Sequence, residues 1–169
     1  MRLICLFLLL IFTDEQITGL RRTIKDFDSP DISIMNKGGI DMEFKMKPDV
    51  GFYTEVGFGR LDVAGEDEYG FRPYQLLVSS IAVCSGGVLR KVLGKMRMEI
   101  KDIHIQASAE RIEEEANRVS KIHVHFRIEG NSLDEKKIEK AMVLTRKNCS
   151  MVQSVIGSIE VEETFEIIS

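Results

Sequence analysis

Two cysteines of this chain lie in stretches that could support either chemistry or simple packing. Cys84 lies in "PYQLLVSSIAVCSGG", residues 73–87, where a proline is followed by apolar and very small residues. Cys149 lies in "TRKNCSMVQSV", residues 145–155. A thiolate is a strong nucleophile, whereas a free cysteine in an apolar setting often packs as a small hydrophobe. The two thiols can act together only if the fold brings them into contact.

The composition is that of one globular domain. The chain has 169 residues, of which 44% are hydrophobic and 30% are charged, and its formal net charge is -4. Such a chain is long enough to bury a sizeable core. Its mild acidity and the absence of a long basic run argue against nucleic acid as a partner. Three cysteines without a CxxC pair exclude a disulfide scaffold and a zinc ribbon.

Residues 1–41 read as an extension of the domain. Their apolar core, Leu3 to Phe12, is much shorter than the roughly 20 residues of a membrane-spanning helix, and no small-x-small cleavage site follows it. The stretch "KGGIDM", which ends at Met42, can be encoded by a bacterial ribosome-binding sequence followed by a start codon. We therefore expect translation of the native protein to begin at Met42, so that residues 1–41 are a translated leader, or else a disordered or signal-like extension, and the domain covers 42–169. A start at Met42 would remove Cys5. A secreted or surface-tethered protein is the alternative if the leader is real.

A small antiparallel sheet and a long helix are predicted for the first half of this domain. Residues 42–47, 51–56 and 60–65 read as short strands because Pro and Gly turn signals separate them. Pro73 then begins a helix that runs to about Lys95. Its apolar stripe consists of Leu77, Ile81, Cys84, Val88 and Val92. Gly86 and Gly87 lie within this helix, where each glycine costs about 1 kcal/mol relative to alanine, so we expect another backbone to pass close to them.

A hairpin, a second helix and a closing strand are predicted for the second half. Residues 102–110 and 121–128 alternate apolar and polar side chains, as strands buried on one face do, and a charged hairpin tip separates them. Ser132 followed by Glu135 is a capping-box pattern for a helix. The apolar stripe of that helix consists of Ile138, Met142, Thr145, Cys149 and Val152. Residues 158–168 predict the last strand, and both cysteines lie on inward helix faces that pack on sheet.

With these elements in place, the sequence resembles the OsmC/Ohr family of osmotically inducible and organic hydroperoxide resistance proteins. "RPYQLLVSSIAVC" is similar to the family's Pro-x-x-Leu-Leu-(small)-Cys helix, and "NCSMVQSV" is similar to its Cys-Pro-(Val/Ile)-x helix turn. The order of elements and the separation of the two cysteines also agree over about residues 42–168. The resemblance implies an α+β, OsmC-like fold with antiparallel sheets and two long central helices, in which two protomers intertwine as a homodimer.

The resemblance also implies a function. Active members of the family are thiol-dependent peroxidases: one cysteine attacks an organic hydroperoxide and becomes a sulfenic acid, and a second condenses with it to a disulfide. By this resemblance Cys84 is the peroxidatic thiol and Cys149 the resolving thiol. An external dithiol then reduces the disulfide by exchange. We expect a cytoplasmic, bacterial enzyme of the oxidative stress response, with no bound cofactor, no metal and no membrane partner.

Two departures from the family pattern keep a second interpretation open. Active members orient an arginine of the N-terminal strands with a glutamate just after the helix-starting proline, whereas Tyr74 follows Pro73 here, and "PDVGFYTEV" contains no Arg or Lys. A cation is needed because Cys84 lies too far along its helix to feel the helix dipole. The candidate substitutes are Lys47, Arg60 and Arg72, with Glu55 or Asp62 to orient one of them. The alternative is a non-catalytic OsmC-like dimer that binds a small apolar ligand or senses redox state.

Three histidines form a second candidate ligand set. His123 and His125 lie two apart on one predicted strand, and His104 lies on the polar face of the neighbouring strand. Together they could hold a metal ion. Lys121 and Arg127 share this face, and nearby cations disfavour a metal, so a solvated sheet surface is the better interpretation.

Overall fold

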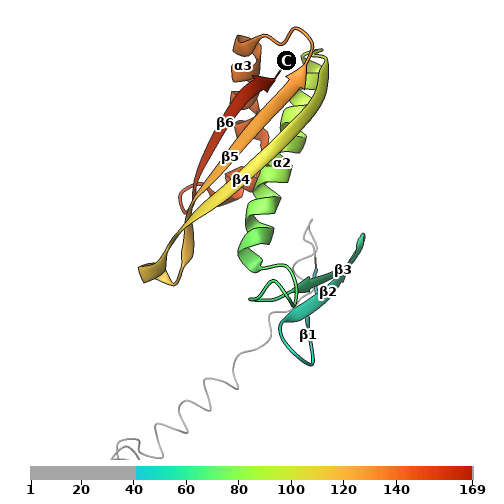
Figure 1. Ribbon diagram of the computed structural model, residues 1–169, viewed down its shortest axis with the longest axis vertical. Coiled ribbons are helices and arrows are strands. Elements are labelled where there is room, and N and C mark those ends of the chain that lie inside the picture. Colours follow the sequence, from blue (N-terminus) through green and yellow to red (C-terminus); the bar gives the residue numbers. More distant parts are fainter. Residues whose placement is uncertain (1–40, 169) are drawn as a thin grey trace, which may run out of the picture. The chain divides into compact units, whose positions relative to one another are not determined.

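The computed structural model describes residues 41–168 (Figure 1). The expected leader over 1–41 lies outside the described residues except for Asp41, and Cys5 also lies outside them. From Glu43 onward the chain forms one compact unit. Two sheets and three α-helices make up its described part, which is an α+β architecture.

The three predicted N-terminal strands are confirmed, but the first strand has only two of its six predicted residues and the other two have five residues each. β1 (Lys45–Met46), β2 (Phe52–Val56) and β3 (Gly59–Val63) form an antiparallel sheet in the order β1-β2-β3. Gly51 makes the turn before β2, with a φ of 84°. A Cβ at this position would lie 2.4 Å from the carbonyl oxygen of Val63, so only glycine fits.

The predicted long helix is confirmed as α2 (Pro73–Lys95). Pro73 occupies the first turn, where its missing N–H costs nothing, and the side chain of Gln75 accepts a hydrogen bond from the backbone N–H of Arg72 at 3.1 Å. The buried face differs from the predicted stripe, since Ile81 is the only residue of that stripe that is fully buried. The face that is buried consists of Ile81, Ala82, Ser85, Gly86, Leu89 and Leu93.

The two glycines of α2 have different surroundings. A Cβ on Gly86 would lie 2.3 Å from the terminal methyl of Ile105, so the helix approaches the sheet closely at this point. The close neighbour is therefore a side chain of the sheet, and the expectation of a neighbouring backbone was wrong here. A Cβ on Gly87 would meet nothing within 4 Å in the described part of the chain.

The larger sheet consists of β4 (Ile100–Ile112), β5 (Arg118–Gly130) and β6 (Glu160–Ile168), in that order. β4 and β5 form the predicted hairpin, joined through a 3-10 turn at Glu113–Glu115. β6 pairs with β5 in parallel, so the expectation of purely antiparallel sheets was wrong for this strand. The chain crosses over through helices between β5 and β6, and such a crossover is what parallel neighbours require.

The second predicted helix is two helices, α3 (Glu135–Asn148) and α4 (Ser150–Val155), interrupted at Cys149. Its N-cap is Asp134, whose carboxylate accepts from the backbone N–H of Lys137 at 3.0 Å. The Ser132 capping box was wrong, because Ser132 has a φ of 51° and lies in the preceding loop. Asn148 ends α3 by donating from its side chain to the carbonyl of Leu144 at 2.7 Å.

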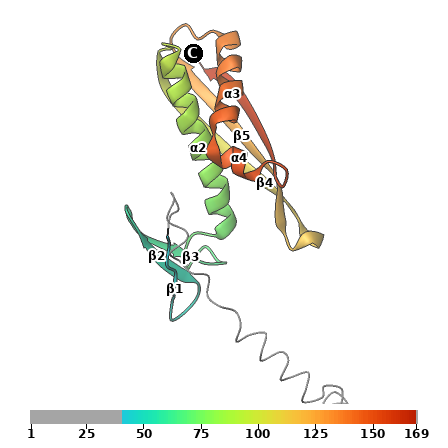
Figure 2. The same ribbon diagram turned by 180° about the vertical axis from the view of Figure 1, so that it is seen from behind.

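The helices cover one face of the larger sheet and leave the other face open (Figures 1 and 2). The buried core lies between them and is centred on β5, whose inward side chains are fully or almost fully buried. These side chains are Ile122, Val124, Phe126 and Ile128. α2 packs on β4 and β5, and α3 and α4 both pack on α2. This packing brings the predicted thiol-bearing segments side by side.

Candidate functional site

Cys84 and Cys149, the two predicted site residues, meet where α2 packs against the junction of α3 and α4. Cys149 is fully buried and Cys84 is half-buried, and both are free thiols. Sγ of Cys84 lies 3.7 Å from Oγ of Ser150, the residue that follows Cys149. The Cys149 thiol is close enough to Cys84 for each thiol to shift the pKa of the other. The structure therefore brings together two sulfur atoms that are far apart in the sequence.

The break in the helix gives Cys149 its position. Its backbone is extended, with φ −79° and ψ 108°, between two helical segments. The N–H of Cys149 still donates to the carbonyl of Thr145 at 2.9 Å, and its own carbonyl accepts from the N–H of Gln153 at 3.0 Å. Cys149 is thus the last hydrogen-bonded residue of α3 and the N-cap of α4. The first backbone N–H groups of α4 remain free to point toward the thiols.

These donors change the acidity of Cys84. Burial raises the pKa of Cys84, but hydrogen bonds from the N–H of Met151, the thiol of Cys149, and the hydroxyl and N–H of Ser150 together bring that pKa below its ordinary value. The strongest influences within the described part of the chain are burial and hydrogen bonds, and no cationic side chain is among them. A lowered pKa increases the thiolate fraction at neutral pH, which is the form that reacts.

The pKa of Cys149 is shifted in the opposite direction. Burial raises the pKa of Cys149, and the hydrogen bond and negative charge of Cys84 raise it further, against opposing hydrogen bonds from the N–H groups of Val152 and Met151. The pair therefore favours a thiolate at Cys84 and a protonated thiol at Cys149. One thiol can attack an electrophile while the other retains its proton.

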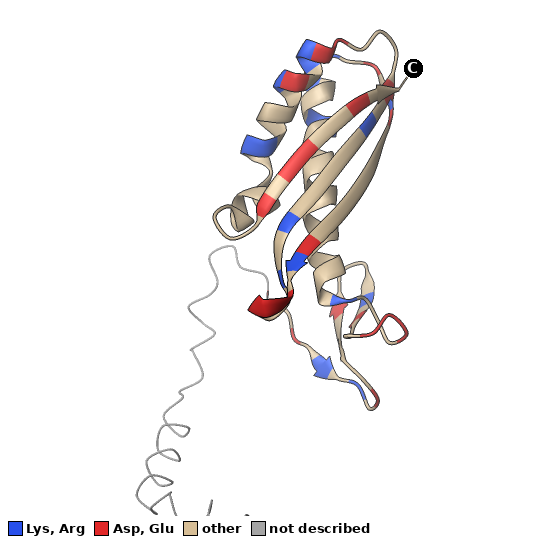
Figure 3. Ribbon diagram, turned by 60° about the vertical axis from the view of Figure 1, so that its left-hand side comes forward, with Lys and Arg blue, Asp and Glu red and all other residues tan. Residues whose placement is uncertain are grey.

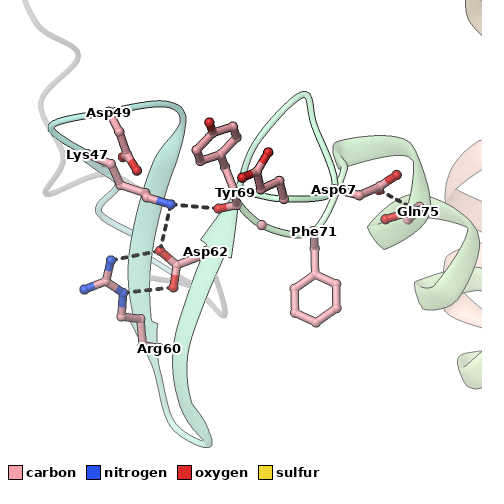
Figure 4. Close-up of a pocket in the computed structure, with 10 residues that line it drawn as sticks. Lys47, Asp49, Arg60, Asp62, Asp67, Tyr69, Phe71 and Gln75 are labelled. Carbon is pink, nitrogen blue, oxygen red and sulfur yellow. Dashed lines mark hydrogen bonds and ion pairs between the residues drawn. The ribbon is translucent and has the colours of Figure 1, made fainter.

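The two candidate cations of the N-terminal sheet, Lys47 and Arg60, are paired with an aspartate (Figure 4). Arg60 makes two hydrogen bonds to Asp62, at 2.8 and 3.0 Å, and these bonds lower the pKa of Asp62. Lys47 lies 3.5 Å from the same carboxylate and donates to the carbonyl of Tyr69 at 2.7 Å. Of the two predicted orienting residues, Asp62 therefore holds both cations, while Glu55 lies opposite Arg60 in the strand register.

Arg72 takes no part in this cluster. Its guanidinium lies 4.0 Å from Asp67 and 4.9 Å from the ring centre of Tyr74, and the guanidinium of Arg111 lies 5.1 Å from the same ring. Tyr74 is thus flanked by two arginines through cation–π contacts. Lys47, Arg60 and Asp62 instead line an open hollow of about 700 Å³ (Figure 4).

From the sequence we did not predict a buried polar network that includes Ser85, the residue after Cys84. The side chain of Glu163 on β6 is only 5% exposed, although it is a carboxylate. It accepts a hydrogen bond from the fully buried Ser85 of α2 and lies 3.4 Å from the guanidinium of Arg146 on α3. Arg146 also donates to the carbonyl of Val161 at 2.7 Å. Glu163 has the same strand parity as the apolar residues of β6, and this is the pattern that could have identified it.

The histidines lie on the face of the larger sheet opposite the buried side chains of β5. The strands of this sheet carry both acidic and basic residues (Figure 3). The two ring nitrogens of His123 lie 2.7 Å from Glu110 and 3.1 Å from Glu162. His125 bonds the hydroxyl of Thr164 at 2.8 Å. His104 lies opposite Arg127 in the strand register. Within residues 41–168, no group of three or more His, Cys, Asp or Glu side chains is arranged to hold a metal ion.

Large apolar side chains remain exposed on two surfaces of the unit. One surface belongs to the N-terminal sheet and the segments flanking it, where Phe58 at the hairpin tip is fully exposed and Met46 is 77% exposed. The other belongs to α2 and α3, where Val83 and Val143 are about 70% exposed. Large exposed apolar side chains that gather on one surface are typical of an interaction site, whereas single ones are common on any protein.

Residues 65–164, more than half of the chain, match a family model described as OsmC-like protein. Protein YhfA of Escherichia coli is 22% identical over 98 residues, which cover 57% of this chain and 73% of that protein. A crystal structure of a hypothetical protein from Aquifex aeolicus is similar with a TM-score of 0.68 and 26% identity, over 76% of this chain and 95% of that one. A crystal structure of an organic hydroperoxide resistance protein OsmC from Legionella pneumophila has a TM-score of 0.61 and 17% identity, over 77% and 99% of the two chains, which is a likeness of fold.

Proposed function

Because this chain belongs to the OsmC-like protein family, we propose that it is a thiol-dependent peroxidase that reduces organic hydroperoxides. In this proposal Cys84 is the nucleophile and Cys149 the resolving thiol. The observation that carries the proposal is that α2 packs on α4 and places the free thiol of Cys84 against Ser150, the residue that follows the free thiol of Cys149. The surroundings also move the pKa values of the two thiols in opposite directions. A solved structure with the same fold is named an organic hydroperoxide resistance protein, which agrees with this chemistry.

The proposed cycle has three balanced steps. The Cys84 thiolate attacks the terminal oxygen of R–O–O–H, which keeps its hydrogen, and the O–O bond breaks. The alkoxide takes from water the proton that Cys84 released on ionisation and leaves as the alcohol R–OH. Cys84 is then a sulfenic acid. The Cys149 thiol attacks the Cys84 sulfur, a disulfide forms, and the sulfenic oxygen leaves as water. An external dithiol reduces this disulfide by two exchange steps and is itself oxidised to a disulfide.

The proposal includes a homodimer that works in the cytoplasm. Exposed apolar side chains on the N-terminal sheet and on α2 and α3 support a second copy of the chain as the partner. The two free thiols support a reducing compartment, in which a cysteine pair persists unless it is oxidised by a substrate. The intertwined arrangement with central helices expected from the resemblance belongs to this proposal as well.

The decisive experiment measures consumption of cumene hydroperoxide with dithiothreitol as the reductant. We expect turnover by the wild-type protein and none by Cys84→Ser. Without dithiothreitol, Cys149→Ser should consume about one equivalent of peroxide per chain and accumulate a sulfenic acid that dimedone labels at Cys84. Equal consumption by wild type and Cys84→Ser would end the peroxidase proposal.

A non-catalytic OsmC-like dimer that binds a small apolar ligand or senses redox state is the second candidate. It is favoured by Tyr74, which is flanked by Arg72 and Arg111 where a carboxylate would orient a catalytic arginine. It is also favoured by the pairing of Lys47 and Arg60 with Asp62. A disulfide between Cys84 and Cys149 that forms with peroxide only stoichiometrically, without dithiol-driven turnover, would support this candidate.

A further inference from the structure

Ser150 occupies a special place between the two thiols. It is the first residue of α4 and follows the buried Cys149 directly, yet its side chain is exposed and contacts Cys84 instead. The distance from its Oγ to the Cys84 Sγ is 3.7 Å. This contact is the only hydrogen bond of the Ser150 side chain among residues 41–168, so the hydroxyl is not used to cap the helix.

We propose that Ser150 is a functional residue of the thiol site, whose hydroxyl donates a hydrogen bond to the Cys84 thiolate and increases the reactive population of that thiolate. A thiolate carries no proton and can only accept, so the hydroxyl must be the donor once Cys84 ionises. A hydrogen bond to an ionised acceptor is shorter and stronger than one between neutral groups. The contact therefore favours the charged form of Cys84 over the neutral form.

The arrangement of the neighbouring groups supports this role. The N–H groups of Ser150 and Met151 also act on Cys84, so one short segment supplies several donors to a single sulfur atom. The cations of the N-terminal sheet, Lys47 and Arg60, are held by Asp62. The sequence led us to expect a side-chain cation that stabilises the Cys84 thiolate. Within the described residues, hydrogen-bond donors provide this stabilisation instead.

The test measures alkylation of Cys84 by iodoacetamide as a function of pH, with the modified peptide quantified by mass spectrometry. In Ser150→Ala the pH of half-maximal alkylation should rise by about half to one unit, since a typical net hydrogen bond in a protein contributes on this scale. The alkylation rate near pH 7 should fall about three- to tenfold accordingly. Ser150→Thr keeps both donors and should restore the wild-type profile.

Ser150→Pro removes more of the proposed interaction with Cys84 than Ser150→Ala does. Proline is well tolerated at the first position of a helix, and the extended backbone of Cys149 suits a residue before proline. Proline removes both the hydroxyl and the N–H, so its alkylation profile should shift to higher pH than that of Ser150→Ala. Thermal unfolding of each variant should stay close to that of the wild type, because the Ser150 side chain is exposed.

Ser154→Ala is the matched control, because it removes a hydroxyl from the same helix that bonds the carbonyl of Ser150 and not a thiol. Its alkylation profile should match the wild type. An unchanged profile in Ser150→Ala, or a shift of equal size in Ser154→Ala, would overturn the proposal. The inference rests on the proposed function only in taking Cys84 as the reacting thiol. Since alkylation needs no peroxide, a protein that fails to turn over hydroperoxide but shows the Ser150 shift would refute the peroxidase function alone.

Discussion

At the level of single residues, the fold gives two thiols different environments. Cys84 is half-buried and is surrounded by hydrogen-bond donors, which lower its pKa despite the effect of burial. Cys149 is fully buried, and both burial and the nearby Cys84 raise its pKa. A nucleophile needs the first environment, and a thiol that must keep its proton until a sulfenic acid forms needs the second.

This difference predicts the order in which the thiols are alkylated as pH rises. Cys84 should be labelled at a lower pH than Cys149 in the folded protein, and both should react alike near pH 8.5 after denaturation. Because the folded-state pKa of Cys84 is lowered, its ionisation adds stability that is fully present above the denatured-state pKa and is lost as pH falls through the folded-state value. Peptide mass spectrometry after timed alkylation checks the order. Labelling of Cys149 first would reverse the assigned roles.

Thr145 provides a second prediction at this scale. Its hydroxyl is fully buried and has no hydrogen-bond partner within residues 41–168. Because a buried unpaired hydroxyl is unfavourable, Thr145→Val should raise the free energy of unfolding by about 1 kcal/mol. Urea denaturation measures the change. A loss of stability in Thr145→Val would show that the hydroxyl has a partner in the native protein, such as a bound water.

At the level of the elements, the interruption between α3 and α4 matters most. A continuous helix would satisfy the N–H of Ser150 and Met151 within its own turns. The extended backbone of Cys149 instead begins a new helix whose first N–H groups are available to Cys84. The short α4 is therefore the element that changes the acidity of a thiol on a different helix.

Glu163 joins three elements, since it lies on β6 and contacts Ser85 of α2 and Arg146 of α3. Glu163→Ala leaves the buried Ser85 hydroxyl without an acceptor and Arg146 without its counter-charge. We expect the free energy of unfolding to fall by about 2–4 kcal/mol, as measured by urea denaturation. Glu160→Ala removes an exposed carboxylate from the same strand and should have a much smaller effect. Equal effects of the two substitutions would show that burial of Glu163 contributes nothing.

At the level of the whole molecule, a single chain leaves too much apolar surface uncovered. α2 has a mean hydropathy of 1.6 over its most apolar window, yet only 33% of that window is buried within the chain. By length and composition alone α2 could cross a membrane, a property that core helices of soluble proteins share. Gly87 and Val83 lie on its uncovered side. A second copy of the chain is the cover that we propose.

The proposed dimer makes a direct prediction. Val83→Asp should place a charge in the interface between copies and raise the dimer dissociation constant at least about a hundredfold, as loss of a central apolar contact does. Phe58→Asp should act in the same direction from the N-terminal sheet. Sedimentation equilibrium measures the constant. Ser108→Asp adds the same charge on the open face of β4 and should leave the dimer intact. A wild-type chain that is monomeric at micromolar concentration would contradict the proposal.

The sequence alone determined most of the architecture. Pro73 and the turn residues placed the N-terminal strands and α2 correctly, and the alternating pattern of β4 and β5 identified the hairpin. The two cysteine stretches were enough to indicate the family that the matching family model shows. These features depend on local periodicity and on residue types near one another in the chain, which a sequence displays directly.

Other features were decided only by tertiary structure. The parallel pairing of β6, the rotated buried face of α2 and the interruption at Cys149 depend on which surfaces meet, and no local pattern encodes that. The cation that we expected beside Cys84 also depends on tertiary structure. Lys47 and Arg60 are paired with Asp62, and the groups that lower the pKa of Cys84 include hydrogen-bond donors of α4. A pKa depends on every group within a few ångströms of the titrating atom, and residues 84 and 150 become neighbours only through the packing of α2 on α4.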